Sequence, residues 1–457
     1  MLTFHLMRYL FFTTIFFLFL VNLTAQTPSF SISELPAMPE SVANNAVVSA
    51  MCGDTLCVYS FCGIDETKTP AGIHLKAWRY NTITQIWTQL ADVPDDTGNG
   101  KIAAGASVVN NKIYVIGGYY VEDNFNEESS DDVHVFNPET NEWEEDGALI
   151  PVPIDDHVQA VWDNSLIYIV TGWSDTGNVP DVQIYNPSSD EWLEGTPTPN
   201  TSDYKVFGGS GDIIGNRIIY HGGVRGGFGF FPTAEVRVGN INPLSPNLID
   251  WELMGESEQG NTYRAAAITI PSANAVFWIG GSSLGYNFDG IDYNGTGGVE
   301  PTDKITGFIG FTSAVTFQAQ VIHEDFNVLP MDLRGIARVT TFEEEAQTGI
   351  HQSIICGGID AGQEVSDQVF LINSENIISV KEENSDNALQ WSINSNDLTV
   401  NTPEAPSEMK IYSVDGKLIL QSQHSQTISL SALSKGIYIL SVVLNNSNSV
   451  SMKFTIE

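Results

Sequence analysis

Short apolar runs alternate with polar turns along most of the chain, and this pattern repeats about every fifty residues. The clearest copies are FNPETNEW at residues 136–143 and YNPSSDEW at 185–192, and YNTITQIW at 80–87 is a looser one. Upstream of the first copy, an apolar run ends in two glycines, IYVIGG at 113–118. A period of this length predicts a structural unit that is repeated many times.

Each repeat predicts four short strands. Strand a turns tightly into strand b, which ends at the glycines, and a variable loop leads to strand c. A turn that often carries Asn-Pro, a good turn-forming pair, then reverses the chain into strand d, which opens with Trp. The glycine-terminated strand occurs six times: 58–63, 113–118, 167–172, 218–223, 276–281 and 353–358. Four-stranded sheets repeated around an axis form a β-propeller.

The last repeat, from Arg334 to Asn373, has only three predicted strands. The segment SFSISELPAMPE at 29–40 is similar to the d-strand endings, so we predict that it completes the sixth sheet and leaves no open edge. The glycine pair, the aromatic residue and the spaced Trp resemble the Kelch repeat family over about residues 30–375. This resemblance implies a β-propeller, and the count of repeats predicts that it is all-β and six-bladed, which we place at residues 26–375.

The two ends of the chain predict export. Arg8 precedes an apolar run at 9–21 and a plausible cleavage site near Ala25, so residues 1–25 are predicted to be a signal peptide. No later segment is apolar enough to predict a membrane span in the mature chain. We therefore expect a secreted protein or one at the outer cell surface.

A polar linker at residues 376–390 precedes a segment in which apolar and polar residues alternate, 391–457. This alternation predicts a small β-sandwich. The motifs Ile411-Tyr412, Asp415-Gly416-Lys417 and Gly436-Ile437-Tyr438 resemble the C-terminal sorting domain of the Bacteroidetes type IX secretion system. The resemblance implies that residues 391–457 engage the outer-membrane secretion machinery. An ordinary accessory domain is the alternative.

Charge and cysteine content restrict the kinds of ligand and cofactor that the sequence predicts. The chain has 56 acidic and 19 basic residues and a formal net charge of −37, which argues against nucleic-acid binding. Its four cysteines form no zinc-binding pattern, and we expect no cofactor. Cys52 and Cys57 are placed to bridge a hairpin, but buried free thiols fit the sequence equally well.

The b–c loops differ most between repeats, so we place the functional face where the b–c and d–a loops meet. Basic residues recur near the start of strand a: Lys101, His157, Lys205, Arg264 and Arg334. Such a ring predicts binding of an anionic group such as a carboxylate. The alternative is that these side chains bond only to neighbouring blades.

Two further candidates lie in the b–c loops. Arg225, in the aromatic stretch VRGGFGFF, is either a ligand contact or part of a packed loop. The oxygen-bearing side chains of Asp289, Asp292 and Asn294 precede Gly295 and are a weak calcium candidate, because an exposed turn explains them as well.

The sequence carries neither a G-x-S-x-G nor an H-E-x-x-H motif. We therefore favour a non-catalytic protein that binds a glycan or protein ligand, and an enzyme is the less favoured hypothesis. Kelch proteins include sialic acid epimerases, so the resemblance implies one alternative: an epimerase or mutarotase of the N-acetylneuraminate type. In that case Arg264 and Arg334 would hold the substrate carboxylate.

Overall fold

The computed structural model describes residues 29–309, 324–325, 328–375 and 390–456, apart from residues 96, 123, 228, 258–259, 274, 395–396, 402–404, 414–417, 432, 434–435 and 444–448. The chain divides into two compact units, residues 1–378 and 379–457. The predicted signal peptide and all but residue 390 of the predicted linker lie outside the described residues.

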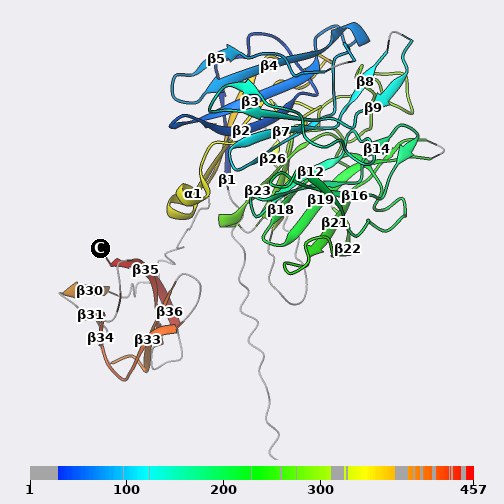
Figure 1. The fold of residues 1–457 in the computed structure, drawn as a ribbon. Helices are drawn as coiled ribbons and strands as arrows, with labels where there is room; N and C mark the ends of the chain where they lie inside the picture. Colours follow the sequence, from blue (N-terminus) through cyan, green and yellow to red (C-terminus); the bar gives the residue numbers. More distant parts are fainter. Residues whose placement is uncertain are drawn as a thin grey trace, which may run out of the picture. The chain divides into compact units, whose positions relative to one another are not determined.

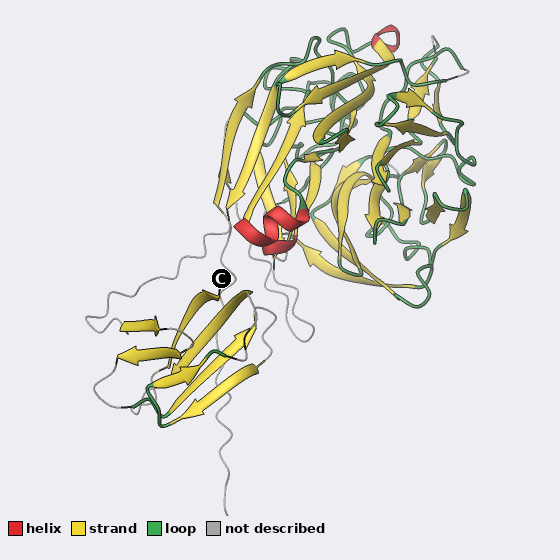
Figure 2. Ribbon diagram, turned by 60° about the vertical axis from the view of Figure 1, so that its left-hand side comes forward, coloured by secondary structure: helices red, strands yellow, loops and turns green. Residues whose placement is uncertain are grey.

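The first unit contains six antiparallel sheets built on four strands each (Figures 1 and 2). The first three sheets are β2 (Ala46–Cys52), β3 (Thr55–Ile64), β4 (Ile73–Asn81), β5 (Ile86–Gln89); β6 (Gly105–Val109), β7 (Lys112–Ile116), β10 (Val133–Asn137), β11 (Glu142–Trp143); and β12 (Val158–Trp162), β13 (Leu166–Val170), β16 (Val182–Asn186), β17 (Glu191–Glu194).

The remaining sheets have the same order. They are β18 (Phe207–Ile214), β19 (Arg217–Arg225), β21 (Glu235–Ile241), β22 (Ile249–Glu256); β23 (Ala266–Ile270), β24 (Ala275–Ile279), β25 (Lys304–Ile309), β26 (Glu324–Asp325); and β27 (Ala337–Arg338), β28 (Ile350–Cys356), β29 (Val369–Glu375), β1 (Ser29–Leu35). Strand β1 therefore takes the place that the sequence predicts for the N-terminal strand.

The recurring tryptophan ties each of the first four sheets to the one before it. In the c–d hairpin, Phe136 pairs with Trp143, and the side-chain oxygen of Asn137 accepts the N–H of Glu139 at 3.0 Å. The indole N–H of Trp143 donates to Ala91 O, in the preceding sheet, at 3.0 Å. Trp87, Trp192 and Trp251 donate in the same way to Pro36, Ala148 and Thr196. The indole thus supplies apolar area and one specific bond between blades.

The ring of sheets closes on itself. Strand β1 pairs with β29 from Ser29↔Glu375 to Leu35↔Val369. Apolar clusters lie between consecutive sheets, and one of them joins the first sheet to the sixth through Val47, Val58, Ala337 and Ile354. The predicted all-β propeller is confirmed, with β1 as the fourth strand of the sixth sheet.

The glycine pair exists because the next blade approaches it closely. Gly117 has φ 63°, and a Cβ there would lie 2.4 Å from Ile154 O at the start of the following blade. The neighbouring Gly118 N–H donates to the same oxygen at 2.9 Å. Any other residue at Gly117 would both strain the backbone and push the blades apart.

The two faces of the propeller carry different structures. The b–c connections form the hairpins β8 (Tyr119–Val121) with β9 (Glu127–Ser129) and β14 (Trp173–Ser174) with β15 (Gly177–Asn178), and strand β20 (Phe231–Pro232) pairs with β19. On the opposite side lies helix α1 (Phe342–Thr348) (Figure 1). We expected a turn there, but Thr341 and Glu344 form a capping box that stabilises a short helix.

The cysteines divide into two kinds. Cys52 and Cys57 form a disulfide across the β2–β3 hairpin, with Cα atoms 6.0 Å apart. Cys62 and Cys356 are buried free thiols, and burial raises the pKa of each to about 12. The disulfide expected across the hairpin is present, and the other two cysteines are the buried free thiols that the sequence also allowed.

The second unit is a small β-sandwich, as predicted. One sheet has the order β30 (Gln390–Asn394), β31 (Asp397–Asn401), β34 (Thr427–Ser429), and the other β33 (Leu418–Gln423), β32 (Glu408–Ser413), β35 (Gly436–Val443), β36 (Ser449–Ile456). Its core contains Leu398, Val400, Met409, Ile411 and Leu440. In the described part of the chain, no helix has the length and apolarity to cross a membrane.

Candidate functional site

Six residues at the starts of the innermost strands share a left-handed backbone, with φ between 47° and 64°. They are Asn44, Ala103, Asp156, Gly208, Arg264 and Asp332, one from each sheet, and we call them the axial ring. Backbone hydrogen bonds join ring neighbours, for example Gly208 N–H to Asp156 O and Arg264 N–H to Gly208 O, both 2.8 Å. Asn44 completes one link with its side chain, which accepts the N–H of Ala103 at 2.7 Å.

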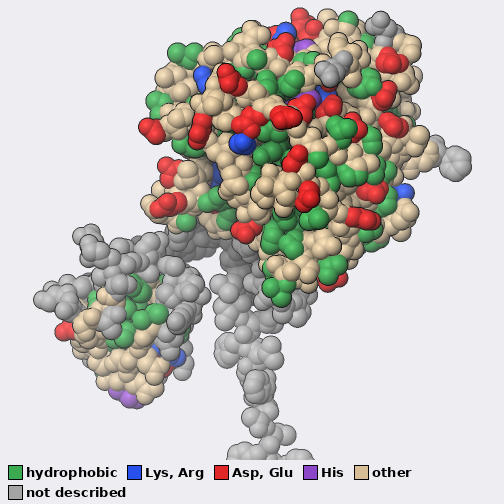
Figure 3. All heavy atoms as spheres, viewed as in Figure 1, with side chains coloured by type: hydrophobic (Ala, Val, Ile, Leu, Met, Phe, Trp, Pro, Cys, Tyr) green, Lys and Arg blue, Asp and Glu red, His purple; other side chains and the backbone are tan. Residues whose placement is uncertain are grey.

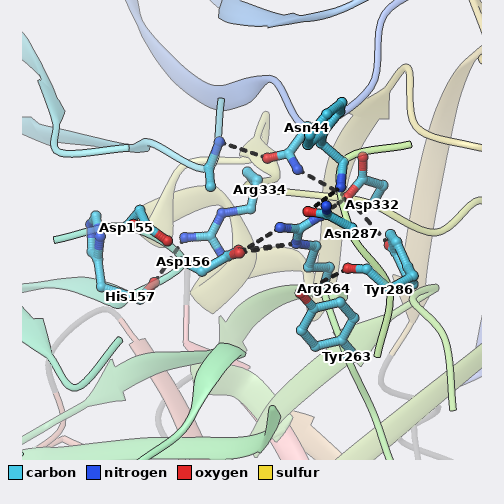
Figure 4. A network of polar contacts seen from close by, with 12 residues as sticks. Asn44, Asp155, Asp156, His157, Tyr263, Arg264, Tyr286, Asn287, Asp332 and Arg334 are labelled. Atoms are coloured by element: carbon cyan, nitrogen blue, oxygen red, sulfur yellow. Dashed lines mark hydrogen bonds and ion pairs between the residues drawn. The ribbon is translucent and has the colours of Figure 1, made fainter. Parts of the chain in front are cut away.

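Ion pairs cross the axis within this ring (Figure 4). The Arg264 guanidinium contacts Asp156 at 2.5 Å and Asp332 at 3.0 Å, and all three side chains are at most 1% exposed. Arg334 Nη1 lies 3.5 Å from Asp156. Because Arg334 and Asp156 belong to the sixth and third of six sheets, opposite one another, this contact spans the propeller axis.

The network keeps Arg264 charged. Burial alone would lower the pKa of Arg264, but the charges of Asp156 and Asp332 raise it well above its usual value. The guanidinium also lies over the Tyr263 and Tyr286 rings, at 5.1 and 5.4 Å from their centroids. A buried cation with two carboxylates and two aromatic faces is fully engaged. It therefore seals the axis and leaves little capacity for an added anion.

A small pocket of about 50 Å³ lies beside this network on the b–c/d–a face. Its walls are mainly aromatic, and three carboxylates reach it: Glu127 at the exposed rim of β9, and the buried Asp155 and Asp156. Asp155 accepts the Ser129 hydroxyl at 2.6 Å. Burial, and then the charge of Asp156, raises the pKa of Asp155 well above its usual value.

A larger cavity of about 730 Å³ follows the axis on the other side of the ring, lined by the inner strands of all six sheets. His157 and Arg334 line it, and the buried His157 Nδ1 and Arg334 Nε have no hydrogen-bond partner among the described residues. Burial and the Arg334 charge lower the pKa of His157 to about 4, so this imidazole is neutral at pH 7. The cavity is therefore lined by two side chains that each have a nitrogen atom free to form a further hydrogen bond.

Comparison with known proteins identifies the repeats. Residues 46–281, about half of the chain, match the KLHDC2/KLHL20/DRC7 Kelch-repeats domain. The chain belongs to this Kelch-repeat family. Residues 392–457 match the secretion system C-terminal sorting domain, which confirms the resemblance of the tail and indicates secretion or cell-surface localisation.

The Kelch domain is similar to several curated proteins over part of their length. It is 22% identical to human Kelch-like protein 23 over 208 residues, which are 45% of this chain and 33% of that protein. It is 29% identical to Pasteurella multocida N-acetylneuraminate epimerase over 139 residues, 30% of this chain and 33% of the epimerase. The chain thus spans about a third of the length of these relatives.

A solved structure shares the fold. The structure of YjhT superposes with a TM-score of 0.54 and 15% identity, covering 81% of this chain and all of that one (100%). At this identity the likeness shows the fold alone.

The predicted basic residues do not occupy one equivalent position in the Kelch domain. Only Arg264 belongs to the axial ring; Lys101, Lys205, His157 and Arg334 lie one to three residues from the ring position of their blades. The sequence spacing was misleading because the innermost strands differ in length, from two residues in β27 to eight in β18. Binding of an anionic group by these residues stays a prediction.

Lys101 lies in an acidic cluster of its own. Its Nζ is 2.7 Å from Asp132, 3.3 Å from Asp95 and 3.0 Å from His134 Nε2. The ligand atoms of Asp95, Asp132 and His134 lie within 4.8 Å of one another, a spacing that would suit a metal ion. The ammonium already supplies the positive charge there, so this cluster is accounted for by the protein itself.

The other candidates lie at the b–c and d–a loops. Arg225 Nη2 donates to Thr233 at 2.9 Å, which ties its own loop together. Lys205 is half-buried, and its backbone N–H donates to Thr201 O at 3.0 Å. The Asp292 side chain accepts the N–H of Asn294 at 2.8 Å.

The calcium candidates form turns and loop contacts. Asp289 accepts the Ile291 N–H at 3.0 Å, and Asn294 accepts the Phe230 N–H from a neighbouring loop at 3.1 Å. These bonds account for one oxygen of each side chain. Calcium binding stays a prediction.

Sequence reasoning missed the carboxylates that organise the site. Asp156 and Asp332 hold the two arginines, and the adjacent Asp155 supplies a further acid. A usable signal was present: Asp and Asn tolerate the left-handed conformation, and Asn44, Asp156 and Asp332 each precede a predicted innermost strand. The aromatic residues of the b–c loops, by contrast, have no fixed position in the repeat.

Proposed function

We propose that this protein is an exported, non-catalytic Kelch protein that binds a protein ligand with its b–c/d–a face. One observation carries the proposal: the b–c loops are held by a single apolar cluster over a sealed axis. This cluster unites Tyr119, Trp173, Phe230, Tyr286 and Tyr293 from four loops. Loops fixed in this way form a preorganised docking surface, and preorganisation favours binding.

The pocket on this face is too small for an enclosed reaction on a sugar. A volume of about 50 Å³ corresponds to roughly four water positions. The face is therefore suited to contact with a large partner, with the pocket accepting one small group. The sorting domain brings this surface to the cell exterior, where such a partner is encountered.

Site-specific photo-crosslinking tests the proposal. A photoreactive residue replaces Phe231, which is 60% exposed on a b–c loop, and as a matched control Ile83, which is 75% exposed on a c–d turn of the opposite face. Incubated with surface proteins of the producing organism, the chain should crosslink from position 231 and not from 83. Equal crosslinking, or crosslinking from 83 alone, contradicts the proposed face. Binding on a glycan array without any protein crosslink would change the ligand class.

A sugar-acid epimerase or mutarotase is the second candidate, supported by the axial cavity of about 730 Å³. Arg334 and His157 line its closed end, whereas Arg264 lines the small pocket on the other side of the ring. The two arginines thus face different spaces and do not form the carboxylate clamp expected from the sequence. Acceleration of N-acetylneuraminate anomeric exchange, followed by NMR and lost in Arg334→Gln, would support this candidate; no acceleration removes it.

A further inference from the structure

The small pocket and the ion-pair network beside it together hold more acidic than basic side chains. Arg264 and Arg334 are matched by Asp156 and Asp332, two cations against two carboxylates. Asp155 and Glu127 also reach the pocket, and neither forms an ion pair with a Lys, Arg or His of the described chain. Two carboxylates therefore lack a cationic partner there.

The walls of the pocket favour cations as well. Phe230 contacts Tyr293 with ring centroids 4.7 Å apart, and Trp173 contacts Phe207 at 5.4 Å and Phe230 at 5.7 Å. Trp173, Phe230 and Tyr293 are only partly buried, so part of their surface remains for a ligand. The negative faces of aromatic rings attract ammonium groups and disfavour anions.

We propose that this pocket binds an alkylammonium group, presented by a lysine side chain of the protein ligand; this inference rests on the proposed function. Glu127 supplies the counter-charge, the Asp155 carboxyl group offers a second oxygen acceptor, and Trp173, Phe230 and Tyr293 surround the carbons next to the nitrogen. A pocket of about 50 Å³ admits such a group and excludes a sugar ring. The ligand charge is thus opposite to the anionic group expected from the sequence.

The charge of the propeller surface has the same preference. Acidic side chains are spread over the visible face of the propeller, where Lys and Arg are few (Figure 3). The formal net charge is −37. A field of this sign raises the local concentration of a cationic partner and speeds its association, more so at low salt.

Calorimetric titration of the full chain with small probes tests the pocket. The probes are Nα-acetyl-lysine N-methylamide, its uncharged analogue with norleucine, and tetramethylammonium. The variants are Glu127→Gln and, as a matched control on the same strand, Glu128→Gln, which lies outside the pocket lining. Thermal melts establish that each variant is folded. We expect the lysine probe to bind, with at least roughly tenfold weaker binding for the norleucine probe and for Glu127→Gln, since a charged hydrogen bond is lost.

Each outcome decides the inference. Equal binding of the lysine and norleucine probes, or equal affinity in Glu127→Gln and Glu128→Gln, refutes charge recognition. Binding of tetramethylammonium without the lysine probe refutes the lysine assignment and points to a free quaternary amine. Crosslinking from position 231 without any probe binding leaves the proposed function standing and removes this inference alone. Probe binding without crosslinking supports the preference of the pocket for an alkylammonium group and removes the proposed function.

Discussion

Two adjacent carboxylates, Asp155 and Asp156, should respond oppositely to the same substitution. Asp156 contacts Arg264 at 2.5 Å and Arg334 at 3.5 Å, inside the sealed axis. In Asp156→Asn the shape is kept, but Arg334 loses its only carboxylate among the described ion pairs, and Arg264 keeps only Asp332. Removing one partner of a buried pair costs about 3–5 kcal/mol, so we expect a loss of that size in the free energy of unfolding.

Asp155→Asn should cost little or stabilise. Its charge has no cationic partner among the described ion pairs, and an amide oxygen can still accept the Ser129 hydroxyl. Burial and the Asp156 charge raise the pKa of Asp155 in the folded protein. The folded state then holds this proton more tightly than the unfolded state, so the wild type loses stability as pH rises above about 4. Asp155→Asn removes that loss, and its advantage should shrink as the pH is lowered toward 4.

Urea unfolding followed by tryptophan fluorescence measures both effects, because eight of the nine tryptophans precede residue 378. The exposed turn variant Asp163→Asn is the control and should change stability by no more than about 0.5 kcal/mol. If Asp156→Asn costs less than about 1 kcal/mol, or if Asp155→Asn costs as much as Asp156→Asn, the account of the sealed axis is wrong.

Three further predictions concern the fold. Trp143→Phe keeps the packing against Phe136 but loses the bond to Ala91 O, so it should cost about 1 kcal/mol or more, measured by chemical denaturation. Burial acts to raise the pKa of Glu345, but hydrogen bonds from His351, Ser272 and Arg338 lower it to about 2. The free energy of unfolding of the wild type should therefore fall by roughly 3 kcal/mol as pH falls from about 4.5 to 2. Glu345→Gln should lack this loss in acid titrations. Truncation after Ile378 should leave the propeller melt unchanged and stop export in a host with type IX machinery, whereas deletion of 29–35 should lower the melting temperature.

The repeat was readable from sequence because its causes are local. An Asn that accepts its own turn amides, a glycine pair under the next blade and a Trp at a fixed distance act within one unit or between neighbours. Placement of β1 beside β29 followed from counting strands in the last repeat. Helix α1 was missed because its capping box lies where a tight turn between strands a and b was expected.

The site was not readable in the same way, because its contacts join blades that are distant in sequence. Asp156 and Arg334 are brought together only when the third and sixth sheets face each other across the axis. The recurrence of basic residues near the start of strand a did not reveal this, since the length of the innermost strand varies. The aromatic walls pose the same difficulty: Trp173, Phe230 and Tyr293 come from three loops of different length.

The charge of a ligand that a site prefers depends on the charged side chains that have no ion-pair partner within the protein. The charged residues that are merely present near the site do not decide it. From the sequence, the basic residues near the axis predict an anionic ligand. In the structure, Lys101, Arg264 and Arg334 each find carboxylates within the protein. With 56 acidic and 19 basic residues, carboxylates outnumber cations almost threefold, so a buried cation readily meets an acidic partner while some acids remain without one. The unpaired groups at a site in such a protein are therefore expected to be acidic, and Asp155 and Glu127 are this remainder at the pocket on the b–c/d–a face.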